Sequence, residues 1–204
     1  MNTENTTETQ TDEVVKNPIA KYVILDTETG GLDPRVNALI QVSFIIADAD
    51  LNELDTFAHR VIPRPGFTVD PFAAQVNGYN EAEWIRTGMD WEQADRAYSQ
   101  YIQQWFGTRK AVAVAHNAPF DDKFVRIHLP SVSPLFFDPW FCTLSALKRW
   151  RTRTTIPGKN KLSDLADLAQ FKHASGDKAH DALGDTKTCL AGLRWLMAQN
   201  TVLG

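Results

Sequence analysis

The chain has 204 residues, 43% of them hydrophobic and 23% charged, which suits one globular domain with a substantial core and excludes a fibrous or wholly disordered protein. No apolar run reaches the roughly 18 to 20 residues that span a membrane, and the N-terminus lacks the pattern of a secretory signal. We therefore expect a cytoplasmic protein without membrane contact. Cys142 and Cys189 lack metal-ligand spacing and are expected to be buried thiols.

Residues 1–17 are rich in Thr, Asn and Glu, carry a net charge of −3 and hold few large apolar side chains. Such a segment buries too little surface to offset its ordering entropy, so we expect a disordered acidic tail before a single domain at 18–204. Apolar, β-branched runs follow at 21–27, 38–48 and 56–62. Their short connections predict an antiparallel meander.

The first expected strand ends in two carboxylates, Asp26 and Glu28. Residues two apart on a strand point to the same face, with Cα atoms about 6.6 Å apart. Like charges this close favour a bound cation, although an acid near glycine is also ordinary turn chemistry. The pair alone leaves both interpretations open.

Beyond residue 70 the apolar side chains recur mainly at helical spacing. We expect helices at 71–76, 81–87, 90–106, 119–129, 142–150, 162–171 and 181–199, and strands at 111–115 and 135–138. In the helix at 119–129, Asp122 lies four residues before Arg126 and can form a surface ion pair. Asp121 instead shares the apolar stripe with Val125, so we expect it to face inward.

The last expected helix places Asp185 on its apolar face, beside Cys189. An isolated buried carboxylate is strongly destabilising unless it is paired or binds a metal. Asp181 suits the N-cap position of this helix, and His180 directly precedes it. A lone histidine is usually structural or exposed, but one beside an inward carboxylate can take part in chemistry.

A basic segment lies between Leu147 and Leu162, with six cations and no acid. These cations are Lys148, Arg149, Arg151, Arg153, Lys159 and Lys161. Trp150 is interleaved with them, and Pro157–Gly158 interrupts the run. The segment suits either a solvated loop or a loop that binds the phosphates of a nucleic acid.

Four carboxylates thus have a reason to face inward: Asp26, Glu28, Asp121 and Asp185. Like charges in one pocket raise each other's pKa, and hard divalent cations remove that repulsion. Oxygen-only ligands favour Mg²⁺ or Mn²⁺ over zinc, and two such ions about 4 Å apart can stabilise the attacking and leaving oxygens of a phosphoryl transfer. The residues therefore predict metal-dependent phosphodiester hydrolysis.

Three motifs, in this order, resemble those of the DnaQ-like DEDDh 3′-to-5′ exonucleases. They are D-x-E followed by Gly-Leu at 26–32, H-N-A-x-F-D at 116–121 and H-x-A-x-x-D at 180–185. The resemblance implies an α/β, RNase H-like fold, in which a five-stranded mixed sheet has helices on both faces. It also implies two divalent cations, Mg²⁺ or Mn²⁺, bound by the four carboxylates with Asp26 bridging both, and His180 as the general base.

The resemblance and the basic segment together indicate which residues bind substrate. These expected contacts are Thr27, Leu32, Asn77, His116, Asn117, Phe120, Lys148, Arg149 and Arg151. Two positions depart from the family pattern. Gly30 replaces a common threonine, which can alter the grip on the terminal base, and Val76 stands where the nuclease T subgroup has an aromatic residue.

We therefore expect an exonuclease that releases nucleoside 5′-monophosphates from single-stranded 3′ ends, with DNA favoured over RNA. An exoribonuclease, either an oligoribonuclease or an RNase T-like trimming enzyme, is the nearest alternative. A non-catalytic nucleic-acid-binding module is an alternative of another class. A polymerase or a repair protein would be the partner if the domain serves proofreading or repair.

Overall fold

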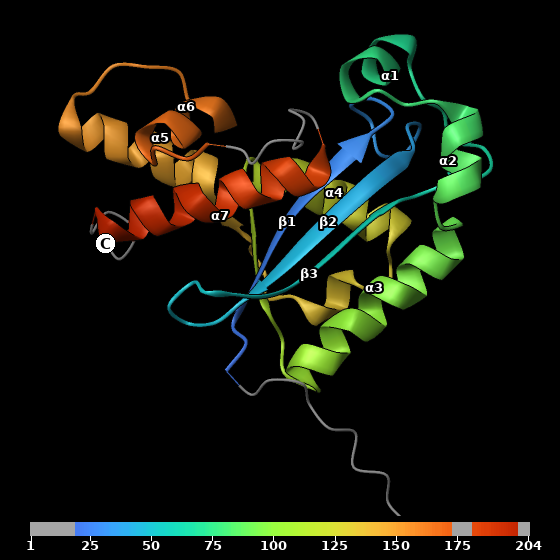
Figure 1. Cartoon of the computed structure of the whole chain (residues 1–204), viewed down its shortest axis with the longest axis horizontal. Helices are drawn as coiled ribbons and strands as arrows, with labels where there is room; N and C mark the ends of the chain where they lie inside the picture. Colours follow the sequence, from blue (N-terminus) through green and yellow to red (C-terminus); the bar gives the residue numbers. More distant parts are fainter. Residues whose placement is uncertain (1–18, 173–180, 200–204) are drawn as a thin grey trace, which may run out of the picture.

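The computed structural model describes residues 19–172 and 181–199, so the expected acidic tail at 1–17 lies outside the described residues. Figure 1 shows a central sheet with long helices packed on both of its sides. The elements are β1 (Tyr22–Thr29), β2 (Leu39–Ala47), β3 (Glu53–Arg60), α1 (Pro71–Asn77), α2 (Glu81–Thr87), α3 (Trp91–Phe106), β4 (Val112–Ala115), α4 (Ala118–His128), η1 (Ser133–Leu135), β5 (Phe141–Cys142), α5 (Thr143–Thr154), α6 (Leu162–Leu168) and α7 (Ala182–Ala198).

The sheet has five strands in the order β3-β2-β1-β4-β5. Strands β1, β2 and β3 form an antiparallel meander, whereas β4 pairs in parallel with both β1 and β5. The predicted mixed sheet and the predicted meander are therefore confirmed. Strand β1 occupies the centre of the sheet, and β2 pairs with it along its whole length.

Alternate side chains of β1 enter two different cores. Val23 and Leu25 point into the larger core, which α3 and α4 cover. Ile24 points to the opposite face, where it packs with side chains of α7. Since Asp26 and Glu28 follow Ile24 in steps of two, both acids lie on the α7 face of the sheet.

Helix α7 also contacts α5 and α6. The Leu165 side chain of α6 is fully buried against Gly192, where a Cβ atom would lie 2.3 Å from it, so glycine permits the close approach. Leu147 and Trp150 of α5 join the same hydrophobic cluster. This packing places the basic helix α5 beside the helix that carries Asp185.

The strand expected at 135–138 is wrong. This part of the chain contains the end of η1 and an isolated bridge between Phe136 and Ala111. The fifth strand comes later, as β5. Pro139 separates the two stretches, and because proline has no amide hydrogen it cannot continue a strand ladder through this point.

Several boundaries also differ from expectation. Strand β3 covers Glu53–Arg60 instead of the expected 56–62. Its side chains are at least partly exposed, so the apolar pattern does not mark its ends. Helix α5 continues to Thr154, so the first half of the basic segment is helical.

Cys189 is buried as expected, but Cys142 is only half-buried. None of the helices in the described ranges combines the length and apolar character that a membrane span requires.

Candidate active site

Three carboxylates from two elements converge at the end of β1. Asp26 and Glu28 come from β1, and Asp185 comes from the first turn of α7. One carboxylate oxygen from each residue lies within 4.8 Å of the other two, and all three side chains are partly buried. Oxygen donors this close favour a shared hard divalent cation.

Asp121 approaches the same acids from α4. It is 3% exposed, so the expectation that it faces inward is confirmed. Its Oδ1 accepts hydrogen bonds from the amide of Thr27 at 3.2 Å and from the Thr27 hydroxyl at 2.8 Å. Pairing between β1 and β4 ends at Ile24, so this amide lies beyond the strand ladder and Asp121 is its partner. Asp122 instead forms the expected ion pair with Arg126, at 2.8 Å.

Burial raises the pKa values of Asp26, Glu28 and Asp121, and neighbouring negative charges add to the rise. Burial is the main cause for Asp26, and the charges of Asp121 and Asp185 add to its raised pKa. Burial, followed by the charge of Asp185, raises the pKa of Glu28 to about 8. Burial raises the pKa of Asp121 to about 7, although the hydrogen bonds from Thr27 oppose the rise. The cluster therefore retains protons near neutral pH unless a cation neutralises it.

Asp181 differs from its expected role as a helix cap. It occupies the N-cap position of α7, but its side chain makes no capping hydrogen bond. Its Oδ1 accepts from Nε2 of Gln41 at 2.6 Å, and Gln41 lies opposite Glu28 in the β1–β2 register. Its charge also raises the pKa values of Asp26 and Glu28. Asp181 is thus a fifth carboxylate near the acids. Its partner Gln41 is too distant in sequence for a local pattern to indicate the contact.

His180 lies outside the described residues, so its role as general base stays a prediction. The described chain resumes at Asp181.

Helix α1 stands at the end of β1 (Figure 1). Nδ2 of Asn77 donates to the carbonyl oxygen of Thr29 at 3.1 Å, and the amide of Asp70 donates to the carbonyl oxygen of Gly30 at 2.7 Å. A Cβ atom at Gly30 would lie 2.4 Å from the carbonyl oxygen of Thr68. The glycine that departs from the family pattern therefore lets the segment before α1 cross close to the motif.

Exposed apolar side chains lie near this end of β1. Leu32 is 84% exposed and Phe72 is 78% exposed. Val76 lies four residues after Phe72, so both share one face of α1. Phe72 was not among the expected contacts, because its exposure becomes visible only in the structure. Phe120 is partly buried, and the exposed Asn117 adopts a left-handed conformation before α4.

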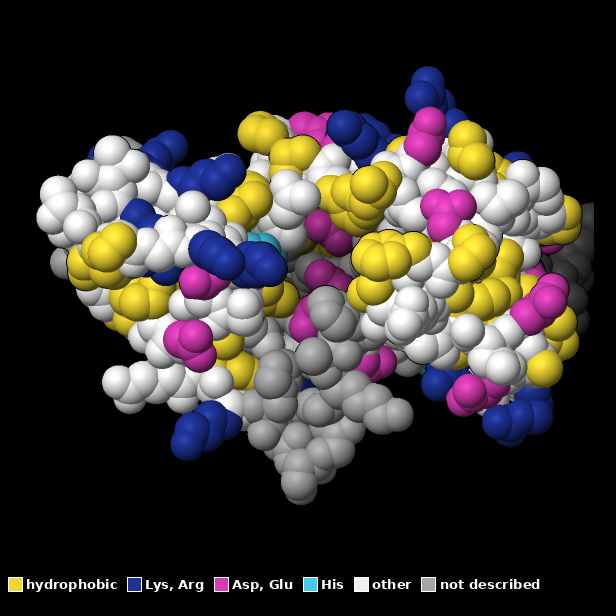
Figure 2. All heavy atoms as spheres, turned by 90° about the horizontal axis from the view of Figure 1, so that it is seen from above, with side chains coloured by type: hydrophobic (Ala, Val, Ile, Leu, Met, Phe, Trp, Pro, Cys, Tyr) yellow, Lys and Arg dark blue, Asp and Glu magenta, His cyan; other side chains and the backbone are white. Residues whose placement is uncertain are grey.

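Figure 2 shows acidic side chains in a hollow between two raised parts of the molecule. Lys and Arg side chains border it on the side of α5 and α6, and hydrophobic side chains border it on the side of α1 and α2. Phosphates are attracted to cations and bases stack on apolar surfaces, so this arrangement suits a single nucleic-acid strand.

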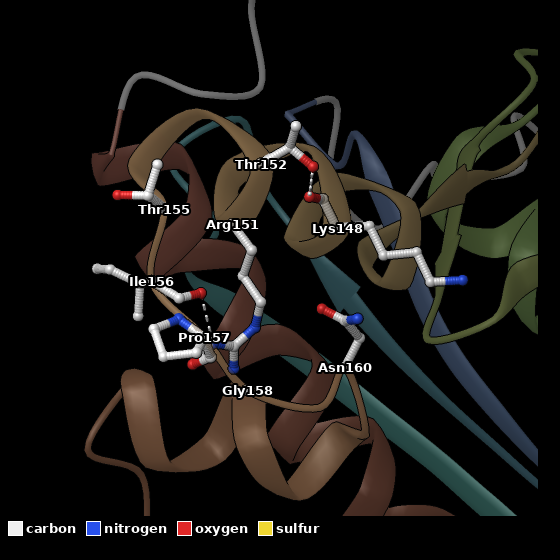
Figure 3. A pocket seen from close by; sticks show the side chains of 8 residues that line it. All are labelled: Lys148, Arg151, Thr152, Thr155, Ile156, Pro157, Gly158 and Asn160. Atoms are coloured by element: carbon white, nitrogen blue, oxygen red, sulfur yellow. Dashed lines mark hydrogen bonds between the residues drawn. The ribbon is translucent and has the colours of Figure 1, made fainter.

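The basic segment consists of the second half of α5 and the loop at 155–161. Side chains from both parts line a pocket of about 550 Å³ (Figure 3). Nη1 of Arg151 donates to the carbonyl oxygen of Pro157 at 2.7 Å, so this guanidinium holds the loop. The Lys148 side chain extends away from Arg151, and both Lys148 and Arg149 are exposed.

The RNase_T family model, described as exonuclease, matches residues 23–193. The chain belongs to this exonuclease family. Ribonuclease T of Salmonella choleraesuis (strain SC-B67) is 30% identical over 176 residues, which cover 81% of this chain and 79% of that protein. The DNA polymerase III PolC-type of Thermotoga petrophila is 25% identical over 170 residues, which cover 82% of this chain but 11% of the polymerase.

Solved structures confirm the RNase H-like fold. A zinc-bound complex of E. coli exonuclease I with single-stranded DNA has a TM-score of 0.71 at 19% identity, covering 89% of this chain and 41% of that one. Exonuclease I of Methylocaldum szegediense has a TM-score of 0.72, with the same identity and coverage. The chain thus spans about two fifths of these structures. The family membership makes it a 3′-to-5′ exonuclease domain, a phosphodiester hydrolase.

Proposed function

We propose that the domain at 18–204 removes nucleoside 5′-monophosphates from single-stranded 3′ ends in a reaction that requires two divalent cations. The supporting observation is the convergence of carboxylate oxygens from Asp26, Glu28 and Asp185 within 4.8 Å, with the buried Asp121 beside them. The donors are all oxygens, and burial together with neighbouring charges raises the pKa values of Asp26 and Glu28. This donor set suits Mg²⁺ or Mn²⁺.

The four acids would hold the two cations, which when bound would neutralise charge on the reacting phosphoryl oxygens. Asp26 would contact both cations. Thr27 occupies Oδ1 of Asp121, so Oδ2 is the oxygen that would face a cation. His180, five residues before Asp185, would accept the proton from the attacking water.

The borders of the hollow would orient the strand. Leu32, Phe72 and Phe120 would contact the terminal bases from the apolar side, because every base offers a flat face for stacking. Lys148 and Arg149 would contact phosphates from the basic side, where they are exposed. Thr27, Asn77, Asn117 and Arg151 would contact the same strand, although three of them also bond to protein groups. His116 was also an expected contact, but both of its ring nitrogens bond to protein groups.

DNA is the substrate that we propose as preferred, because Val76 stands where the nuclease T subgroup has a stacking aromatic. RNA trimming is the second candidate, and the 30% identity to a protein named Ribonuclease T favours it. Matched DNA and RNA oligonucleotides with free or blocked 3′-hydroxyls separate the two. Faster removal of ribonucleotides would reverse the preference. The similarity to a PolC-type polymerase supports a polymerase partner, which co-purification would test.

Adjacent acids provide a matched test of the site. Asp121→Asn should reduce cleavage of a 5′-labelled oligonucleotide with Mg²⁺ by at least about a hundredfold, because a charged group at the reacting centre is lost. Asp122→Asn should remain within about twofold, since it alters only a surface ion pair. Unchanged substrate with the unmodified protein, or internal cuts from the first time point, would refute the proposed function and leave a binding module.

A further inference from the structure

His116 joins three elements near the acids. Its Nδ1 lies 3.0 Å from Oγ1 of Thr143, the first residue of α5, and its Nε2 lies 3.1 Å from the carbonyl oxygen of Asn160, in the loop before α6. A carbonyl oxygen only accepts, so Nε2 carries the hydrogen and donates it. Burial lowers the pKa of His116, which favours the neutral ring, and Nδ1 then accepts from the Thr143 hydroxyl. Protein groups thus engage both ring nitrogens.

Thr143 extends this connection to α7. It is fully buried, and its Oγ1 lies 3.7 Å from Sγ of Cys189. The same Oγ1 lies 3.3 Å from the carbonyl oxygen of Ala115, so the Thr143 hydroxyl contacts β4 as well as His116 and Cys189, and either Thr143 or Cys189 can be the donor in the contact between them. Cys189 lies one turn beyond Asp185. A chain of hydrogen bonds therefore links the helix of Asp185 to His116 and onward to the basic loop.

The loop at 155–161 is held at two points. Arg151 binds its first half at Pro157, and His116 binds its second half at Asn160. Lys159 and Lys161 directly flank Asn160, and both are exposed. The hydrogen bond from His116 therefore fixes the positions of Lys159 and Lys161 relative to the motif at 116–121, which ends in the buried Asp121.

We propose that His116 is a positioning residue: it holds the loop at 155–161 beside the acidic site, so that Lys159 and Lys161 bind phosphates of the strand whose 3′ end is cut. This inference rests on the proposed function. Loss of the anchor leaves the acids in place, so it weakens the binding of a long strand more than it slows the chemical step.

Two substitutions separate the two ring contacts. In His116→Gln, the side-chain amide reaches the position of Nε2 and still donates to the Asn160 carbonyl. In His116→Asn, the shorter side chain reaches only Thr143. We expect His116→Asn to raise KM for a 12-nucleotide strand by about threefold to tenfold, the range of one lost hydrogen bond, with kcat within about twofold. His116→Gln should restore KM to within about twofold of the unmodified protein.

Limited digestion with trypsin measures the loop without activity, because trypsin cleaves after Lys159 and Lys161. Cleavage at these bonds should be about threefold to tenfold faster in His116→Asn than in His116→Gln. Equal cleavage rates and equal KM values, or a loss of kcat alone, would overturn the proposal. Unfolding of both variants by circular dichroism would also overturn it, since His116 would then support the whole fold. If the unmodified protein cuts no oligonucleotide, the proposed function fails, while the trypsin rates still support or refute the anchor.

Discussion

One oxygen of Asp121 accepts two hydrogen bonds from Thr27, one from its amide at 3.2 Å and one from its hydroxyl at 2.8 Å. Thr27 lies between Asp26 and Glu28 in sequence but points to the other face of β1. The strand therefore presents two acids on one face and orients a third acid from the other.

Replacing Thr27 by valine tests this orientation. Thr27→Val keeps the shape and the amide bond but removes the hydroxyl, so we expect kcat to fall about tenfold, the effect of roughly one hydrogen bond to a charged group. Thr27→Ser keeps the hydroxyl and should retain most activity. Single-turnover rates at saturating Mg²⁺ provide the measurement. A valine variant as fast as the serine variant would show that the amide alone orients Asp121.

Stability without divalent cations should decrease as pH rises. The folded protein keeps protons on Glu28 up to a pKa of about 8 and on Asp121 up to about 7, whereas ordinary values are 4.5 and 3.8. Between these limits the folded state binds more protons than the unfolded state, so the free energy of unfolding falls with rising pH. Thermal unfolding in EDTA from pH 5 to pH 8 measures this. Mg²⁺ should raise the unfolding temperature more at pH 8 than at pH 6, and a flat profile would contradict the raised pKa values.

Asp181→Asn distinguishes repulsion from helix capping. An asparagine still accepts the hydrogen bond from Gln41 but no longer repels Asp26 and Glu28. We expect the unfolding temperature in EDTA at pH 8 to rise by about 2–4 °C, the change that roughly 1 kcal/mol causes in a domain of this size. Affinity for Mg²⁺, measured by titration calorimetry, should fall because a nearby negative charge is lost. An unchanged unfolding temperature would show that Asp181 lies too far from the acids to matter.

Phe72→Ala tests the apolar border of the hollow. Phe72 is 78% exposed, so its removal should leave stability unchanged, while the loss of a stacking surface should raise the Kd for a single strand by about fivefold or more. Phe137→Ala is the control, because Phe137 is also exposed, at 54%, but bonds to Ala111 just before β4, at the end of the sheet away from the acids. Fluorescence anisotropy with a labelled strand gives the affinities. Equal effects of the two substitutions would exclude a specific contact at Phe72.

The sequence predicted what depends on local pattern. The step of two along β1 and the helical stripe of α4 were sufficient to place Glu28 and Asp121 correctly. Contacts between distant segments were not predictable in this way. The bonds from Thr27 to Asp121 and from Gln41 to Asp181 depend on the packed sheet and helices, and β5 is too short to show a period. The family motifs indicated which residues meet, but not which atoms bind.

The central position of β1 determines how the acids respond to their own repulsion. Every residue from Tyr22 to Glu28 is in register with β2, and the strand ends under the segment that crosses Gly30. A strand at a loose sheet edge can fray and so separate crowded charges. Strand β1 cannot do so without disrupting both cores. Proton uptake or cation capture are the remaining routes. The rigidity of the sheet is therefore what converts electrostatic repulsion into affinity for a metal.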